Sequence, residues 1–157
     1  MSLAAPTSPA VNGAPFRLAV VAARYNPALV EALLGRVLDG LRLAGVMAGN
    51  VTVVRVPGSH EVPVAVQLLA RPQTVDCVIG LGVLIGGDTR HHEMVGQSVS
   101  QALQRVALDT RVPVINGVIV TDTLSQARAR CTGKIDRGAE FARAALEMAA
   151  LKKKLSR

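Results

Sequence analysis

One glycine turn in the middle of the chain combines the groups best suited to chemistry. Residues 78–85 form an apolar run that ends at Gly86-Gly87, and Asp88, Thr89 and His91 follow. The apolar run predicts a buried strand, and the glycines allow a sharp turn that comes close to a ligand. Asp88 or Thr89 can cap the helix that follows, and a helix start directs free N–H groups and a partial positive charge outward. The turn is therefore a candidate anion site beside a titratable imidazole.

The elements that position this turn alternate between strand and helix. We expect strands at 16–23, 51–56, 75–85 and 113–120. We expect helices at 27–44, 62–70 and 90–110, a shorter helix capped by 121–123 that runs to about 130, and a last helix at 136–155. For the first helix, Asn26 is the expected N-cap and Pro27 the first helical residue. The alternation predicts an α/β fold with a parallel sheet, whose strand-end loops gather on one edge.

Composition narrows the class of protein. The 157 residues suit one domain, here 15–157, after an arm at 1–14 that is rich in Ala, Pro, Ser and Gly and is expected to be flexible. No apolar run reaches the length of a membrane span, so no membrane partner is expected. The net charge of +7 suits an anionic small substrate. Nucleic acid is not an expected partner, because the basic residues are not interleaved with aromatic ones.

The two cysteines favour a reducing compartment. Cys77 falls inside an apolar strand, where a thiol is usually inert, and Cys131 is the second. Their number and spacing give neither a disulfide framework nor a CxxC metal motif. Together with the lack of a signal-peptide pattern, this predicts a cytoplasmic protein.

Several common active-site motifs are missing from the sequence. Gly80-x-Gly82 lacks the third glycine of a dinucleotide fingerprint, because Ile85 takes its place, and there is no GxxxxGK[ST] loop. His91 and His92 are adjacent and would point about 100° apart on a helix, so they share no metal-binding face and no metal is expected. What remains is acid–base chemistry at an anion site.

Six segments follow one another in the order and spacing of a known family. They are Ala23-Arg24-Tyr25-Asn26, Val56–Pro63 (VPGSHEVP), Gly80–His91 (GLGVLIGGDTRH), Val112–Val118 (VPVINGV), Thr121–Ala127 (TDTLSQA), and Arg137-Gly138 with Ala144–Met148 (AALEM). Through them the chain resembles the 6,7-dimethyl-8-ribityllumazine synthases over about residues 16 to 155. No single segment is decisive, but their order and spacing together are highly specific.

The resemblance implies a fold, an assembly and a reaction. The implied fold is a flavodoxin-like three-layer sandwich, in which helices flank a four-stranded parallel sheet. The implied assembly is a homopentamer with active sites between subunits, which in some members builds a larger particle such as a decamer or a hollow capsid. The implied reaction joins 5-amino-6-(D-ribitylamino)uracil to 3,4-dihydroxy-2-butanone 4-phosphate, releases phosphate and water, and needs neither cofactor nor metal.

The resemblance also implies roles for the residues that contact the pyrimidine. His91 matches the proton-transfer residue; from the turn alone, a histidine that caps the helix or faces solvent is equally open. Tyr25 matches the aromatic that stacks on the ring, with a core or interface aromatic as the alternative. Val83-Leu84-Ile85 match the strand end whose backbone reads the uracil edge. Asn116 matches a position that lines the ring from the neighbouring subunit, or makes an interface hydrogen bond.

Two further groups of residues match the ribityl and phosphate contacts. Ser59-His60-Glu61 match the segment that holds the ribityl chain, where a carboxylate can accept two hydroxyl donors. Asp88, Thr89 and Arg130 match the phosphate site, and a guanidinium suits a phosphate because its fork binds two oxygens. Arg128 is a rival to Arg130, and His92 is expected to pack.

The sequence departs from the family pattern at several of these positions. Asp88 replaces a small uncharged residue and would repel phosphate unless it turns away to cap the helix. Gly86 replaces a frequent arginine, Asn116 a frequent phenylalanine and His60 a bulky apolar residue. The break at 131–137 is one residue short, which favours the pentamer over the capsid.

Two other functions remain open at this point. One is a non-catalytic protein that binds flavin or another ribityl ligand on the same scaffold, with tight flavin binding and no turnover. The other is a general phosphate-ligand module, which would be a monomer because it needs no site between subunits.

Overall fold

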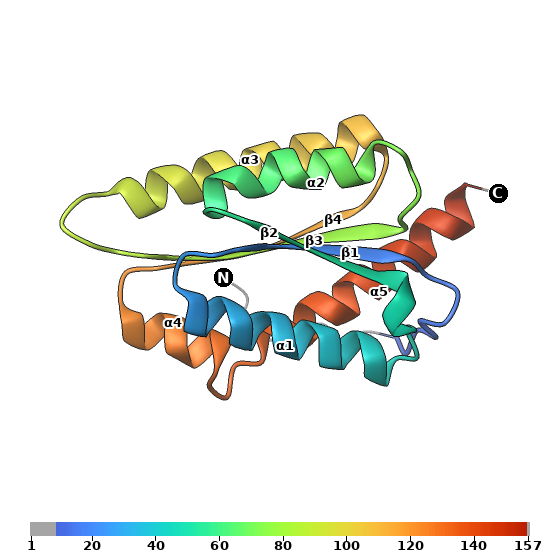
Figure 1. Cartoon of the computed structure of the whole chain (residues 1–157), viewed down its shortest axis with the longest axis horizontal. Helices are drawn as coiled ribbons and strands as arrows, with labels where there is room; N and C mark the ends of the chain where they lie inside the picture. The colour runs from blue at the N-terminus through green and yellow to red at the C-terminus, as the bar shows by residue number, and fades with distance from the viewer. Residues whose placement is uncertain (1–8, 157) are drawn as a thin grey trace.

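Four parallel strands form one sheet at the centre of the molecule (Figure 1). The structure is a computed structural model that describes residues 9–156. The strands are β1 (Leu18–Ala23), β2 (Val51–Val56), β3 (Cys77–Ile85) and β4 (Val114–Thr121), and they lie in the order β2-β1-β3-β4. The last residue of β1, Ala23, pairs with Val56, and the last residue of β3, Ile85, pairs with Thr121. The loops that follow the four strands therefore share one edge of the sheet.

Helices cover both faces of the sheet. In Figure 1, α2 (Val62–Ala70) and α3 (His91–Thr110) lie above it, and α1 (Pro27–Leu43), α4 (Leu124–Cys131) and α5 (Arg137–Leu155) lie below it. Two single 3₁₀ turns, η1 (Ala48–Asn50) and η2 (Ser59–Glu61), precede β2 and α2. This is a three-layer α/β arrangement consistent with a flavodoxin-like fold, and it confirms the predicted fold class.

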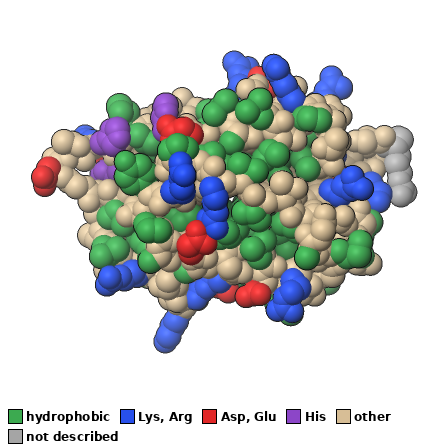
Figure 2. Space-filling view, viewed as in Figure 1, with side chains coloured by type: hydrophobic (Ala, Val, Ile, Leu, Met, Phe, Trp, Pro, Cys, Tyr) green, Lys and Arg blue, Asp and Glu red, His purple; other side chains and the backbone are tan. Residues whose placement is uncertain are grey.

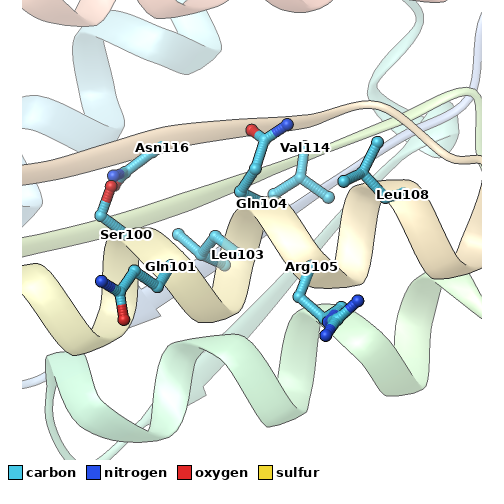
Figure 3. Close-up of a pocket in the computed structure, with 8 residues that line it drawn as sticks. All are labelled: Ser100, Gln101, Leu103, Gln104, Arg105, Leu108, Val114 and Asn116. Atoms are coloured by element: carbon cyan, nitrogen blue, oxygen red, sulfur yellow. The ribbon is translucent and has the colours of Figure 1, made fainter.

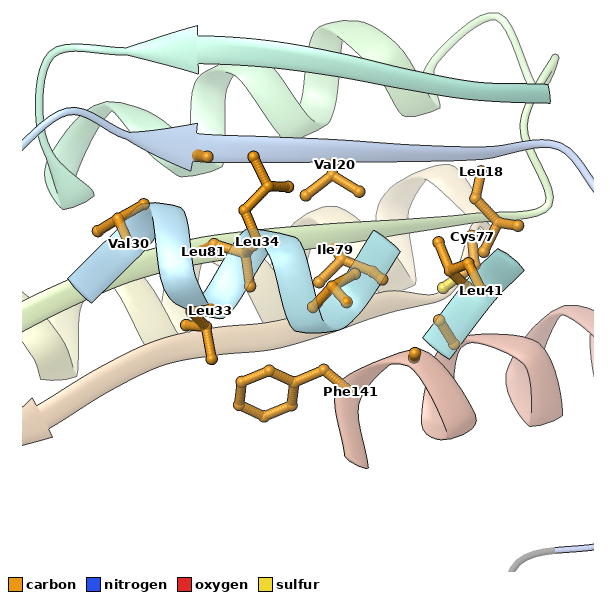
Figure 4. Close-up of a cluster of buried hydrophobic side chains, with 14 of the residues drawn as sticks. Leu18, Val20, Val30, Leu33, Leu34, Leu41, Cys77, Ile79, Leu81 and Phe141 are labelled. Atoms are coloured by element: carbon orange, nitrogen blue, oxygen red, sulfur yellow. The ribbon is translucent and has the colours of Figure 1, made fainter. Parts of the chain in front are cut away.

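The side chains of β1 alternate between two apolar cores. Leu18, Val20 and Ala22 pack on the α1 and α5 side. Figure 4 shows Leu18 and Val20 there with leucines of α1 and with Phe141. Ala19, Val21 and Ala23 pack on the other side, against α2 and α3. All six residues of β1 are buried, as expected for a strand covered on both faces. Because each fully buried valine or leucine contributes about 1.5–3 kcal/mol, these two cores fix the sheet against its helices.

Most predicted elements agree with the structure within two residues, and the differences have physical reasons. β1 begins at Leu18 rather than at residue 16, although Phe16 is buried. The reason is that the backbone N–H of Arg17 donates to the Asp76 carboxylate at 2.8 Å and not to a neighbouring strand. The two 3₁₀ turns were not predicted, since three residues are too few for a periodic pattern. On α5, the buried face consists of Phe141, Ala142, Ala145, Leu146 and Ala149, whereas Met148 and Leu151 lie off that face and are exposed.

Residues 9–14 run along the end of α1. The Gly13 N–H donates to the Ala44 carbonyl at 2.7 Å, and Gly13 itself is buried. Residues 1–8 of the predicted flexible arm lie outside the described residues. Within residues 9–156, no helix is both long enough and apolar enough to cross a membrane.

Candidate active site

The strand-end loops enclose a cavity of about 530 Å³ beyond the carboxyl ends of β1 and β3. Strand order reverses between these two strands, and α/β sheets commonly bind ligands at such a point. Of the twelve predicted site residues, nine line this one cavity: Tyr25, Ser59, His60, Glu61, Val83, Leu84, Ile85, Thr89 and His91. Asn26, Gly58, Gly87, His92 and Val95 complete its wall. Most of the residues that line the cavity were therefore predicted from the sequence.

The loop after β1 presents an aromatic ring to this cavity. Tyr25, the only tyrosine of the chain, is 73% exposed. Its ring face is therefore free to contact a flat ligand. Asn26 follows in the left-handed region, with φ 54°, and asparagine tolerates that region better than most residues. Asn26 is the N-cap residue of α1, as predicted, but its side chain makes no capping hydrogen bond. Instead the Asn26 amide donates to the Val83 carbonyl at 2.9 Å and ties this loop to the end of β3.

The 3₁₀ turn η2 forms the second wall. The Glu61 carboxylate accepts a hydrogen bond from the Gly58 N–H at 2.8 Å, so one of its oxygens is already engaged in holding the turn. Ser59 is buried against β3, and its hydroxyl has no hydrogen-bond partner among the described residues. A side chain at Gly82 would collide with Ser59, so the glycine lets η2 approach the strand. His60 is exposed at the cavity rim.

The glycine turn after β3 is closed by contacts with the turn after β4. The Gly86 N–H donates to the Thr121 carbonyl at 2.8 Å, and a Cβ on Gly86 would lie 2.6 Å from the Asp122 carbonyl oxygen. Neither Gly86 nor Gly87 adopts a positive φ. Glycine is therefore needed at position 86 because the Asp122 backbone lies so close to it, and not because the backbone is left-handed. A Cβ on Gly87 would meet open space.

The helix start differs from the prediction in its capping. α3 begins at His91 with Arg90 at the N-cap position, and no side chain caps it there. Thr89 makes only a long contact, in which its hydroxyl accepts from the His91 N–H at 3.4 Å. Asp88 is exposed, caps nothing and does not line the cavity. The first N–H groups of α3 therefore remain available to an anion, as the turn predicted.

All three histidines of the chain, His60, His91 and His92, line this cavity. Figure 2 shows histidine side chains gathered at the end of the molecule where β3 passes into α3. His91 is exposed and can reach a ligand directly, whereas the His92 side chain is 10% exposed and lies 3.6 Å from Asp122, measured from Nε2 to Oδ1. The prediction that His92 packs missed this neighbour, because Asp122 is distant in the sequence.

Three predicted site residues lie elsewhere on the chain. Besides Asp88, Asn116 is exposed on β4, where its side-chain oxygen accepts from the Val118 N–H at 3.1 Å. It lines a separate groove with Ser100, Gln104 and other residues of α3 (Figure 3). Arg130 on α4 donates to the Gln126 carbonyl at 3.0 Å and does not line the cavity; its rival Arg128 is exposed and does not line it either.

These features define a class of protein. A parallel α/β sheet carries, at its strand-order reversal, a cavity with a free aromatic ring, an uncapped helix start and histidines, which suits a flat ligand joined to an anion. Residues 15–153 match the family model described as 6,7-dimethyl-8-ribityllumazine synthase. The chain therefore belongs to the 6,7-dimethyl-8-ribityllumazine synthase family.

Individual relatives agree with the family assignment along nearly the whole chain. A protein of Nitrosospira multiformis named 6,7-dimethyl-8-ribityllumazine synthase is 42% identical over 147 residues, which cover 94% of this chain and 90% of the relative. Proteins with the same name are 45% identical in Salinibacter ruber, covering 88% and 90%, and in Mycolicibacterium vanbaalenii, covering 96% of each chain.

Proposed function

We propose that this protein condenses 5-amino-6-(D-ribitylamino)uracil with 3,4-dihydroxy-2-butanone 4-phosphate to 6,7-dimethyl-8-ribityllumazine, phosphate and water, in riboflavin biosynthesis. The main observation behind the proposal is that one cavity is lined by all three kinds of residue that the reaction needs: those suited to bind a ring, a polyol and an anion. The names of the relatives support the same reaction.

We assign the proton transfers to His91. Imine formation, phosphate loss and ring closure each move protons near neutral pH, where an imidazole can both accept and donate them. Support comes from its position in the first turn of α3, exposed and beside the uncapped N–H groups that would bind the phosphorylated substrate. A proton donor next to the leaving phosphate can neutralise the charge that develops on it.

The pyrimidine and its ribityl chain would occupy the wall between β1 and η2. Tyr25 offers its exposed ring face for stacking. The backbone of Val83-Leu84-Ile85 would pair with the uracil edge. Ser59-His60-Glu61 would hold the ribityl hydroxyls, and the free oxygen of the Glu61 carboxylate can accept from them while the other holds Gly58.

The phosphate would bind at the start of α3. Thr89 and the first backbone N–H groups of the helix supply donors there, and the exposed Asp88 is directed to solvent rather than into the cavity wall. Arg130 would supply the guanidinium. Because Arg130 and Asn116 do not line the cavity of their own chain, we assign both to the cavity of an adjacent subunit.

We infer that the working form is a homopentamer, which can assemble further into a decamer or capsid. Support comes from apolar side chains that are exposed on α3 and α5: Leu108, Met148, Leu151 and Leu155 line one groove. Contiguous exposed apolar surface of this kind usually marks an interface between proteins.

We also propose a cytoplasmic location. The support for it is that both cysteines, Cys77 and Cys131, are free and buried.

The experiment is an assay of the purified protein with both substrates. Lumazine absorbance and inorganic phosphate are followed together, and the proposal expects them to appear in equal amounts. Binding of flavin or substrate without turnover would overturn the proposal in favour of a non-catalytic binding protein. Sedimentation velocity tests the assembly: a pentamer or a multiple of it supports the site between subunits, and a monomer contradicts it.

A further inference from the structure

His92, Glu93 and Asp122 bring three potential metal ligands together at the rim of the cavity. One ligand atom from each residue lies within 4.8 Å of the other two, and His92 Nε2 lies 3.6 Å from Asp122 Oδ1. His92 and Glu93 belong to the first turn of α3, and Asp122 belongs to the turn after β4. The cluster therefore bridges two segments that are 29 residues or more apart in the sequence.

The burial of His92 sets this cluster apart from an ordinary group of surface acids. Only 10% of its side chain is exposed, and both ring nitrogens are buried without a hydrogen-bond partner among the described residues. A buried polar group without a partner costs free energy, so a fold seldom keeps one without a use. The proposed reaction does not use it, because the proton transfers are assigned to His91.

A simple ion pair does not account for the arrangement. Asp122 is 79% exposed, and an ion pair with so exposed a carboxylate gains little in water. As a metal ligand, by contrast, the His92 imidazole would use a ring nitrogen that has no other partner among the described residues.

The geometry suits a small divalent transition cation. Zinc lies about 2.0–2.1 Å from nitrogen and oxygen ligands, so two ligands of a tetrahedral site are separated by about 3.3 Å. The 3.6 Å pair is close to that value, and the exposed carboxylates of Glu93 and Asp122 can close the remaining gap by rotating. The two carboxylates also offset the positive end of α3, which would otherwise disfavour a cation. An imidazole among the ligands favours zinc-like ions over magnesium and calcium, which prefer oxygen.

We propose that His92, Glu93 and Asp122 form a binding site for one divalent transition-metal ion such as Zn²⁺. The ion would join the start of α3 to the turn after β4, and the Gly86–Thr121 hydrogen bond already links the glycine turn before α3 to the last residue of β4. It would thereby hold the glycine turn in place at the mouth of the cavity. This site rests on the side-chain geometry alone and does not depend on the proposed reaction.

Calorimetric titration of the purified protein with Zn²⁺ at pH 7.5 tests the site. We expect one Zn²⁺ per chain, and a Tm that rises with Zn²⁺ because the ion binds only the folded chain. In His92→Gln and Asp122→Ala, the Kd should rise by tenfold or more. Asp122 is exposed, so its variant keeps the test valid if His92→Gln fails to fold.

Matched variants separate this cluster from the other polar groups at the cavity. His60→Gln removes another histidine of the same wall, and Asp88→Ala removes another exposed carboxylate of the neighbouring turn. Both should bind Zn²⁺ like the wild type. The proposal is overturned if the wild type does not bind Zn²⁺, if His92→Gln and Asp122→Ala bind it unchanged, or if the two control variants lose as much affinity. It is also overturned if Mg²⁺ binds as tightly as Zn²⁺, because the imidazole would then contribute nothing.

Discussion

The side-chain amide of Asn26 donates a hydrogen bond to the backbone carbonyl of Val83 across 2.9 Å. The bond joins the loop after β1 to the end of β3, and it is partly buried. It holds Tyr25 at one side of the cavity while leaving its ring exposed. The shape of this part of the cavity wall therefore depends on a contact between two segments that are 57 residues apart in the chain.

Replacing Asn26 by Asp should weaken both stability and substrate binding. The two side chains have the same shape, but the carboxylate has no N–H to donate and would face the Val83 carbonyl. We expect a loss of about 1–3 kcal/mol in the free energy of unfolding, the usual cost of an unsatisfied buried group, and a higher KM for the pyrimidine substrate. Urea unfolding and steady-state kinetics measure the two effects.

Asn12→Asp is the matched control for that change. Asn12 is exposed, and its side-chain oxygen accepts from the Ala14 N–H, which a carboxylate can do as well. Its stability should stay within about 0.5 kcal/mol of the wild type. Equal losses in the two variants would show that the added charge, and not the Val83 bond, is responsible.

The glycine turn offers a second paired test. Gly86→Ala would place a methyl group 2.6 Å from the Asp122 carbonyl oxygen, so the two turns must move apart. We expect about 1–3 kcal/mol of destabilisation, the usual cost of overpacking, and a higher KM for the phosphorylated substrate. Gly87→Ala meets open space and should leave both quantities nearly unchanged. If the two variants behave alike, close packing of the turns is not what fixes the phosphate site.

Patterns within short segments predicted most of the fold. The apolar run of β1, residues 77–83 of the run in β3, and the four-residue spacing of Leu29, Leu33 and Val37 all mark side chains that are buried. Thr123 was expected in the cap of α4, and its hydroxyl does accept from the Gln126 N–H in a capping box. Such signals depend on neighbours within a few residues, so they can be found without the tertiary structure.

Contacts between distant segments could not be predicted in this way. Asn26 is the N-cap residue of α1 as predicted, but the residues around it do not indicate that its side chain will bond to Val83. His92 is nearly buried as predicted, but the sequence does not indicate that Asp122 will lie beside it, because the two become neighbours only when β3 and β4 pair. These contacts depend on the order of the strands in the sheet, which is a property of the whole chain. The position of Asn116 outside the cavity likewise could not be predicted from its neighbours in the sequence.

The buried thiol of Cys77 should make stability fall at alkaline pH. Burial raises the pKa of this thiol to about 12 from an ordinary value near 9.0. Between these values the unfolded chain loses the proton and the folded chain keeps it, so the free energy of unfolding decreases as pH rises above about 9. At pH 10 the loss from this group is about 1 kcal/mol.

Urea midpoints at pH 8 and pH 10 check this expectation. The pKa of Cys131 is also raised, chiefly by burial, so it contributes in the same direction. Cys77→Ala should have a lower midpoint at both values because of the cavity it leaves, but a smaller difference between them. The same pH difference in wild type and variant would contradict the assigned cause.

The most direct test of the account is the turnover of His91→Gln beside the wild type, with lumazine absorbance and phosphate release followed in one reaction. We expect equal lumazine and phosphate from the wild type. For the variant we expect a fall of about 100-fold or more in kcat, with residual turnover, because positioning at the cavity persists without the proton transfer. His91 is exposed, so the free energy of unfolding should change little. A variant that turns over like the wild type would contradict the role of His91, and a wild type without turnover would contradict the proposed reaction itself.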